Sequence, residues 1–264
     1  MNKPGEEPLL SLPERHSRIL SLLQQNGSIS VTQLSELFKV SEVTIRKDLS
    51  YLEQQKKLYR THGSAILISP YISDRHVNEK DKKNVAEKRA IGAAAAALVS
   101  QDDSIIIASG TTMAFLAREI KPVGRLTVIT AAVPVTQILS QHADVDVIQL
   151  GGITRSSSVS VVGPFAESML RNFNCSKLFV GVDGIDTEFG LTTTNMLEAS
   201  LNGAMINAAQ KVVVLADSSK FGRRGFSKIC DLEAVDRIIT DSGVQPLYLE
   251  RLRERGIEVT VVDV

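Results

Sequence analysis

Hydroxyl groups and glycine separate an apolar segment from a helical one near the middle of the chain. Ser109-Gly110-Thr111-Thr112 follows an apolar stretch at 104–108, which predicts a short strand, and leads into a helix predicted at 112–119. The first backbone N–H groups of a helix are unpaired and its dipole favours anions, so small residues there suit a phosphate. The segment predicts a phosphate site, although the same residues also serve as an ordinary helix cap.

Other apolar stretches in the same part of the chain are followed by glycines, an arginine, a lysine and carboxylates. A cation and backbone N–H groups can bind a phosphate, and carboxylates can bind the hydroxyls of a polyol. Each segment alone is typical of a turn or a surface pair, so the prediction depends on their being placed together. The candidate effector-binding residues are Ser109, Gly110, Thr111, Thr112, Gly151, Gly152, Arg155, Asp183, Glu198, Asp217 and Lys220.

The elements between these segments must bring them together. From about residue 84 to residue 264, short apolar strands alternate with helices. This alternation is typical of a doubly wound, mostly parallel sheet covered on both faces. In such an α/β fold, ligands bind beyond the carboxyl ends of the strands, where the polar segments lie. The sequence therefore predicts an effector-sensing α/β domain over 84–264.

The N-terminal part of the chain has a different pattern. Three runs of apolar residues at helical spacing each follow a serine that can cap a helix, which predicts three short helices. Residues 57–68 combine charged and β-branched residues around a glycine, and predict two strands and a turn. Three helices and a hairpin form a winged helix-turn-helix, predicted over 11–68. The polar stretch 69–83 predicts a linker.

The third predicted helix is the candidate DNA reader. Ile45, Leu49 and Leu52 recur at helical spacing and predict its buried face, so polar and basic residues occupy the opposite face. The chain has a net charge of zero, but residues 39–62 contain six Lys/Arg and three Asp/Glu, which suits a DNA-contacting surface or a solvated one. The candidate DNA-binding residues are Ser30, Thr32, Ser41, Val43, Thr44, Arg46, Lys47, Ser50, Arg60 and His62.

Composition excludes several kinds of protein. No apolar run reaches the ~18 residues of a membrane span, and the N-terminus lacks the apolar stretch of a signal peptide, so we expect a cytoplasmic protein with no membrane partner. Cys175 and Cys230 are far apart, and we expect both to be reduced. The four histidines have no partner at ligand spacing, so we expect neither a metal nor another cofactor.

The motifs resemble those of a known family. VSEVTIRKDL at 40–49 is specific, and residues 15–65 around it resemble the N-terminal domain of the DeoR family of bacterial repressors. SGTT, LGGITRSSSVSVVGP, GVDGID, GLTTTN and ADSSKFGR resemble the family's sensor domain, whose fold resembles pentose-phosphate isomerases and CoA transferases. The resemblance implies a homo-oligomer, dimer or tetramer, that represses sugar-catabolism genes. It would bind double-stranded operator DNA until a phosphorylated sugar releases it.

Two positions depart from the family pattern. Where members usually have Asn after the second sensor strand and Lys four positions after Glu198, this chain has Ala131 and Asn202. One alternative is therefore a repressor with a degenerate sensor domain that binds no ligand. Another is a sugar-phosphate isomerase-like enzyme that uses Asp217 and Lys220 with Glu198 as acids and bases. An enzyme does not need a winged helix, so we expect a regulator without catalytic residues.

Overall fold

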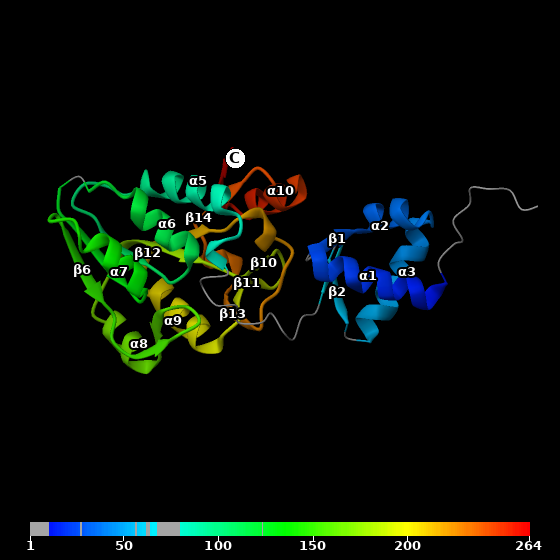
Figure 1. Cartoon of the computed structure of the whole chain (residues 1–264), viewed down its shortest axis with the longest axis horizontal. Helices are drawn as coiled ribbons and strands as arrows, with labels where there is room; N and C mark the ends of the chain where they lie inside the picture. The colour runs from blue at the N-terminus through cyan, green and yellow to red at the C-terminus, as the bar shows by residue number, and fades with distance from the viewer. Residues whose placement is uncertain (1–10, 27, 56, 62–63, 68–79, 123) are drawn as a thin grey trace, which may run out of the picture. The chain divides into compact units, whose positions relative to one another are not determined.

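The chain divides into two units, residues 1–70 and 71–264 (Figure 1). The computed structural model describes residues 11–26, 28–55, 57–61, 64–67, 80–122 and 124–264. The division between the units falls within 69–83, the stretch that the sequence predicts as a linker, of which 69–79 lie outside the described residues. Residues 80–83 are described and belong to the second unit.

Three helices and a three-stranded antiparallel sheet form the first unit. The elements are α1 (Leu12–Asn26), β1 (Ser28–Ser30), α2 (Val31–Phe38), α3 (Glu42–Gln54), β2 (Leu58–Thr61) and β3 (Ser64–Leu67). The sheet order is β1-β3-β2, so the predicted hairpin gains a third strand from the segment between α1 and α2. The sequence does not predict β1, because three residues are too few to show the alternation of a strand.

Serine caps begin α2 and α3, as the sequence predicts. Ser30 Oγ accepts a hydrogen bond from Gln33 N, and the Gln33 side chain accepts one from Ser30 N, which completes a capping box. Ser41 Oγ accepts from Thr44 N at the start of α3. The apolar faces of the three helices meet in one core, whose fully buried members include Ile19, Leu34, Ile45, Leu49 and Leu52.

Seven parallel strands form the central sheet of the second unit, in the order β15-β14-β12-β9-β4-β5-β6. The strands are β4 (Ser104–Ile107), β5 (Leu126–Thr130), β6 (Val145–Gln149), β9 (Cys175–Gly181), β12 (Ala209–Leu215), β14 (Arg237–Asp241) and β15 (Glu258–Val262). The predicted parallel sheet is therefore confirmed, and all seven carboxyl ends lie at one edge.

Helices cover both faces of this sheet. They are α5 (Val85–Ala96), α6 (Thr111–Glu119), α7 (Val133–Leu139), α8 (Pro164–Leu170), α9 (Met196–Asn207) and α10 (Pro246–Glu254). Ile105 and Ile107 of β4 belong to a core that includes residues of α5, α6 and α7. Ile106 belongs to a second core that includes residues of α8, α9 and α10. Successive residues of a strand point to opposite faces, so the apolar run of β4 serves both cores.

Shorter elements lie between the central strands. They are the hairpin β7 (Ile153–Arg155) and β8 (Ser160–Val162), the antiparallel sheet of β10 (Gly184–Asp186), β11 (Gly190–Thr193) and β13 (Ser227–Cys230), and the 3-10 turns η1 (Ser218–Lys220) and η2 (Leu232–Ala234). The sequence does not predict these elements, because three or four residues rich in Gly, Ser and Thr are typical of turns. Two of the candidate effector residues nevertheless lie in them, Arg155 in β7 and Lys220 in η1.

Other sequence-based expectations can be compared with the described residues. No helix in the described part of the chain is long and apolar enough to cross a membrane. Among the same residues, no group of three or more His, Cys, Asp or Glu side chains is placed to hold a metal ion. Cys175 and Cys230 are both free thiols, and burial raises the pKa of Cys230 to about 11.

Candidate DNA-binding face and effector site

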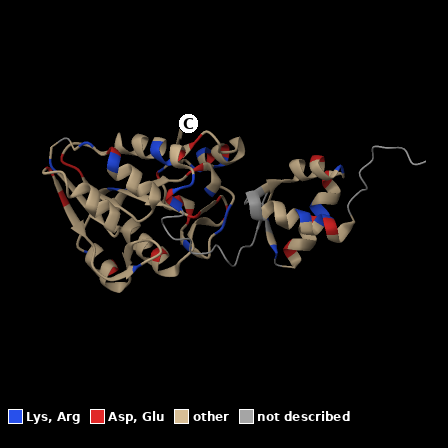
Figure 2. Cartoon of the chain, viewed as in Figure 1, with Lys and Arg blue, Asp and Glu red and all other residues tan. Residues whose placement is uncertain are grey.

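One face of α3 is open to solvent in the first unit. It carries a shallow hollow lined by Val43, Arg46, Lys47, Ser50, Tyr51 and Gln54. Four of these residues are predicted DNA contacts, and they lie opposite the buried Ile45, Leu49 and Leu52. Basic and acidic residues are both present on the helices of this unit (Figure 2). A polar helix face with an apolar patch such as Val43 and Tyr51 can contact both base edges and thymine methyl groups.

Glu42 orients a predicted DNA-reading arginine. Arg46 Nη2 lies 2.6 Å from Glu42 Oε2, one helical turn away on α3. The other carboxylate oxygen, Glu42 Oε1, accepts a hydrogen bond of 3.0 Å from Thr32 Oγ1 of α2. Thr32, itself a predicted DNA contact, is therefore connected to Arg46 through a residue that the sequence reasoning missed. The four-residue spacing of Glu42 and Arg46 is the signal that can find it.

The remaining predicted DNA-binding residues have local partners. Ser41 Oγ lies 2.9 Å from Thr44 Oγ1 at the start of α3, in addition to its capping bond. Arg60 of β2 donates from its backbone N to Glu53 Oε1 at 2.9 Å, and its guanidinium donates to Ser50 Oγ. These contacts connect the wing to the solvent-facing side of α3. His62 lies outside the described residues.

The buried face of α3 carries a carboxylate. Asp48 is 3% exposed, and it accepts two hydrogen bonds from the Arg15 guanidinium of α1, at 2.6 and 3.0 Å. His16 Nε2 lies 3.1 Å from the same carboxylate, and the His16 ring stacks on Tyr51. The hydrogen bond to Asp48 raises the pKa of Arg15. This ion pair fixes α3 against α1, and so sets the direction in which the solvent-facing residues of α3 project.

The order of the strands places the candidate effector residues along the carboxyl edge of the central sheet. From one side to the other, the strands β12, β9, β4, β5 and β6 are followed by Asp217, Asp183, Ser109, Ala131 and Gly151. Neighbouring strands are ~4.8 Å apart, so the ends of β12 and β6 are separated by roughly 19 Å. Residues from both sides can therefore meet a small ligand only where a segment folds back over the edge.

The hairpin β7–β8 makes such a return. Val161 N donates to Ala131 O at 2.9 Å, and Val133 N donates to Val159 O at 3.1 Å, so the hairpin crosses the end of β5. Arg155 on β7 consequently lies beside the first turn of α9, where its Nη1 is 2.5 Å from Glu198 Oε1.

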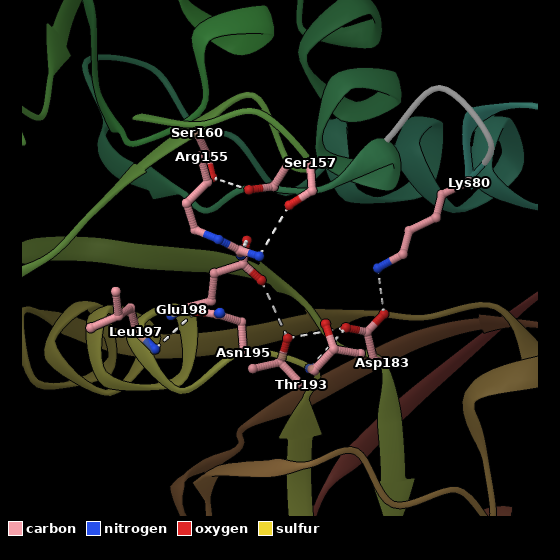
Figure 3. A network of polar contacts seen from close by, with 11 residues as sticks. Lys80, Arg155, Ser157, Ser160, Asp183, Thr193, Asn195, Leu197 and Glu198 are labelled. Atoms are coloured by element: carbon pink, nitrogen blue, oxygen red, sulfur yellow. Dashed lines mark hydrogen bonds and ion pairs between the residues drawn. The ribbon is translucent and has the colours of Figure 1, made fainter. Parts of the chain in front are cut away.

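Two ion pairs come together at the centre of this edge (Figure 3). Lys80 Nζ lies 2.9 Å from Asp183 Oδ1, and Arg155 pairs with Glu198. Thr193 Oγ1 lies between them, 3.0 Å from Asp183 Oδ2 and 3.5 Å from Glu198 Oε2. The structure thus brings together Arg155, Asp183 and Glu198 from the predicted set. It adds Lys80 and Thr193, which the sequence reasoning missed.

Asp183 is held in its ionised form. Burial alone would raise its pKa, but the charges of Lys80 and Lys220, together with hydrogen bonds from Lys80 and Thr193, outweigh burial and hold the pKa below the ordinary value. Asp183 Oδ2 also accepts from Thr194 N at 3.3 Å. The hydroxyl Oγ1 of Thr194 is buried and has no hydrogen-bond partner among the described residues. An ionised acceptor beside a buried unpaired hydroxyl suits a ligand with hydroxyl groups.

Asp217 has different partners from Asp183. Its Oδ1 accepts from Asn84 Nδ2 at 2.9 Å and from Ser219 N at 3.1 Å. Lys220 completes the 3-10 turn that Asp217 caps. Lys88 of α5 is 4% exposed, and it interacts electrostatically with both Asp217 and Lys220. Asn84 and Lys88 are a second set of residues that the sequence reasoning missed, because neither belongs to a recognisable motif.

The N-terminus of α6 is available for an anion. Gly110 occupies the cap position with φ +135° and supplies no side-chain hydrogen bond, and Thr111 and Thr112 in the first turn are each 8% exposed. By contrast, the N-terminus of α9 is capped by Asn195, whose Oδ1 accepts from two first-turn N–H groups. Ser109 is half-buried at the end of β4, directly before this helix.

Glycine at Gly152 has a packing reason. Its φ is +148°, and a Cβ there would lie 2.8 Å from both Val161 Cγ1 and Val162 O. Gly151 is under no such restraint, because the nearest atom to a Cβ would be Met169 Sδ at 3.8 Å. Of the two departures from the family pattern, Ala131 is 1% exposed in the core, and Asn202 is 6% exposed on α9.

Both halves of the chain match known protein families. Residues 15–71 match the model of a DeoR-like helix-turn-helix domain, and residues 83–242 match that of a DeoR C-terminal sensor domain. The chain is 39% identical over 249 residues to the HTH-type transcriptional regulator YulB of Bacillus subtilis, covering 94% of this chain and 96% of that protein. It is 38% identical over 261 residues to a putative aga operon transcriptional repressor of Escherichia coli O157:H7, covering 98% and 97%.

The chain also aligns with a solved structure of a full-length regulator. The sorbitol operon regulator SorC of Klebsiella pneumoniae matches 94% of this chain and 95% of its own, with a TM-score of 0.40 and 12% identity.

Proposed function

Because the chain belongs to the DeoR family of transcriptional repressors, we propose that it represses sugar-catabolism genes and that a phosphorylated sugar releases it from operator DNA. Its relatives are named regulators and repressors, and the chain is a DNA-binding regulator with a sensor domain rather than an enzyme. Relatives named as GlcR and as a lactose phosphotransferase system repressor support a link to carbohydrate metabolism.

The observation that carries the effector proposal is that two carboxylates and a helix N-terminus without a side-chain cap lie at one sheet edge. Asp183 and Glu198 would accept hydrogen bonds from sugar hydroxyls, and the buried Thr194 hydroxyl would gain a partner. The first backbone N–H groups of α6, which receive no side-chain cap from Gly110, would bind the phosphate, with Ser109, Thr111 and Thr112 around them. Neutral carboxylic acids would bind a polyol less well, so the lowered pKa of Asp183 supports the proposal.

The DNA-binding part of the proposal rests on the open face of α3. Val43, Arg46 and Lys47 are exposed there and would enter the major groove. Ser41, Thr44 and the wing residue Arg60 would contact the DNA backbone. Two subunits would read two half-sites about one helical turn apart, ~34 Å. Effector binding would then favour an arrangement in which the two heads no longer match this spacing.

A thermal-shift panel tests the effector class. The full chain is heated with pentose and hexose phosphates and with the unphosphorylated parent sugars. A ligand that binds only the folded protein, at a concentration 100 times its Kd, adds about 2.7 kcal/mol to stability and raises the Tm. We expect this rise with one phosphorylated sugar and not with its unphosphorylated parent. Asp183→Asn is expected to lose the rise. No shift across the panel would contradict the proposal and favour a sensor domain that binds no sugar phosphate.

A further inference from the structure

The segment that leads from the first unit into the second is bound to the candidate effector site. Residues 80–84, here called the latch segment, precede α5 and are the first described residues of the second unit. Lys80, at the start of this segment, pairs with Asp183 at 2.9 Å although the two residues are 103 positions apart. The Lys80 side chain is 31% exposed, against 13% for Asp183.

The side chain of Lys88 binds the backbone of the latch segment. Its ammonium group donates to the backbone carbonyls of Lys80 and Lys83, and the residue is 4% exposed. Burial lowers the pKa of Lys88, and the nearby charge of Asp217 opposes this change. A buried ammonium group that donates hydrogen bonds to two backbone carbonyls of one segment fixes the backbone path of that segment.

Asn84 makes a second connection to the site. It stands at the cap position of α5 with φ +50°, a left-handed conformation that Asn tolerates, but its side chain makes no capping bond. Instead its Nδ2 donates to Asp217 Oδ1 at 2.9 Å and lies 3.4 Å from Ser219 Oγ. The latch segment therefore contacts two of the three predicted effector carboxylates, one at each end.

The hydrogen-bonding capacity of Asp183 shows which contact a ligand would displace. A carboxylate has about four lone-pair sites, and three donors, Lys80 Nζ, Thr193 Oγ1 and Thr194 N, already occupy sites on Asp183. Two sugar hydroxyls that bind this carboxylate together require one donor to leave. Thr193 is buried in β11 and the Thr194 donor is backbone, whereas the Lys80 side chain is the most exposed of the three.

We propose that Lys80 competes with the effector for Asp183, and that its displacement releases the latch segment and so transmits effector binding to the DNA-binding unit. The inference rests on the proposed function for the identity of the competing ligand. In the ligand-free protein the segment is bound at Asp183 and Asp217, and this state is the one that binds operator. The contact between Lys80 and Asp183 lowers the affinity of the protein for the ligand. By linkage, the ligand weakens this contact by the same factor.

The first arm of the test needs no effector. Wild-type chain, Lys80→Met and Lys82→Met are titrated into a duplex that the wild-type protein selects from a random library. Lys82 is exposed in the same segment, and no ion pair of its side chain occurs in the described part of the chain. Its variant therefore controls for loss of positive charge. K80M is expected to bind at least about 10-fold more weakly than K82M. Equal affinities of the two variants would overturn the latch.

Hydrogen–deuterium exchange of the same proteins gives an independent measure. In K80M, and also in Asn84→Ala, the amides of residues 81–88 are expected to exchange faster than in K82M, while the amides of β9 and β12 keep their wild-type rates. Unchanged exchange at 81–88 in K80M would contradict the proposal even if DNA binding fell.

The second arm uses the sugar phosphate that raises the Tm of the wild-type chain most. K80M is expected to bind that compound at least about threefold more tightly than K82M, and adding it should no longer change DNA affinity. Weaker binding by K80M would make Lys80 a ligand of the sugar phosphate and would overturn the competition. If no compound in the panel binds the wild-type chain, the proposed effector class fails, while the DNA and exchange arms still decide whether the latch exists.

Discussion

Arg155 Nη1 and Glu198 Oε1 lie 2.5 Å apart and join the hairpin β7–β8 to the first turn of α9. Their side chains are only 12% and 13% exposed, so removal of either partner leaves a charge in a largely desolvated position. Glu198 also lies at a helix N-terminus, where a carboxylate is favoured by the dipole. The pair is thus both a structural contact and the edge of the candidate effector site.

Glu198→Ala is expected to destabilise the second unit by about 3 kcal/mol, because Arg155 is left with an uncompensated buried charge. Urea unfolding measures the loss, because the midpoint and the m-value together give the free energy of unfolding. The double variant Arg155→Met with Glu198→Leu removes both charges and should recover more than half of it. A double variant that is less stable than Glu198→Ala would show that the pair is not the source of the loss.

The two neighbouring glycines at the start of β7 should respond differently to alanine. Gly152→Ala is expected to cost about 2 kcal/mol, because φ is +148° and the new Cβ would collide with Val162 O. Gly151→Ala should cost less than about 0.5 kcal/mol, since no atom lies within 3.8 Å of its Cβ position. Thermal unfolding of both variants measures the difference. If Gly151→Ala instead weakens sugar-phosphate binding at unchanged stability, the ligand approaches the position of the added Cβ closely.

Under the proposed DNA contact, Arg46→Ala is expected to weaken operator binding by roughly 10- to 100-fold, the usual effect of removing an arginine that contacts a base. Fluorescence anisotropy on the selected duplex measures this change, and Lys121→Ala, which removes an exposed charge from the second unit, is the control. Glu42→Gln should cause a smaller loss, because it weakens only the contact that orients Arg46. Sugar-phosphate affinity, measured without DNA, should stay at the wild-type value, and a change would show that Arg46→Ala disturbs more than the solvent-facing side of α3.

Stability in acid should depend on Asp186 of β10. Burial alone would raise its pKa, but the Arg224 guanidinium and the backbone N–H groups of Phe189 and Glu188 outweigh burial and hold the pKa below its ordinary value. In the window between the lowered pKa and ~4, the unfolded chain binds a proton that the folded chain does not. Stability is therefore complete above this window and falls as the pH drops through it.

Asp186→Asn should remove this contribution, which is at most about 1.4 kcal/mol per pH unit. Urea unfolding of both proteins between pH 3 and pH 6 measures the slopes. The variant is expected to be less stable throughout, with a shallower slope below ~4. Identical slopes would show that Asp186 does not titrate differently in the folded and unfolded chains.

The parts of the fold that the sequence predicts are those with a repeated local signal. The apolar strands predict the parallel sheet because each strand serves two cores, and Ser30 and Ser41 mark helix starts through bonds that span three residues. Gly151 and Arg155 are predicted as part of one segment, but only the hairpin β7–β8, which is too short to show a period, explains how Arg155 reaches Glu198.

The missed residues have partners that are remote in sequence. Lys80 lies in a polar stretch that is typical of a linker, and its partner Asp183 lies 103 positions later, so no local pattern connects them. Asp48 lies on the apolar face of α3, where an acidic residue interrupts the hydrophobic pattern that predicts a buried helix face. Its partner Arg15 on α1 is 33 positions away.

The order of strands in the central sheet has a consequence for synthesis of the chain. Strand β4 pairs with β9, about 70 residues later, and β9, the middle strand of the sheet, in turn pairs with β12 on its other side. During translation the first unit is complete before any of these partners has emerged, because all of its own contacts lie within residues 1–70. We therefore expect the N-terminal DNA-binding unit to fold on the ribosome well before the sensor domain is able to fold.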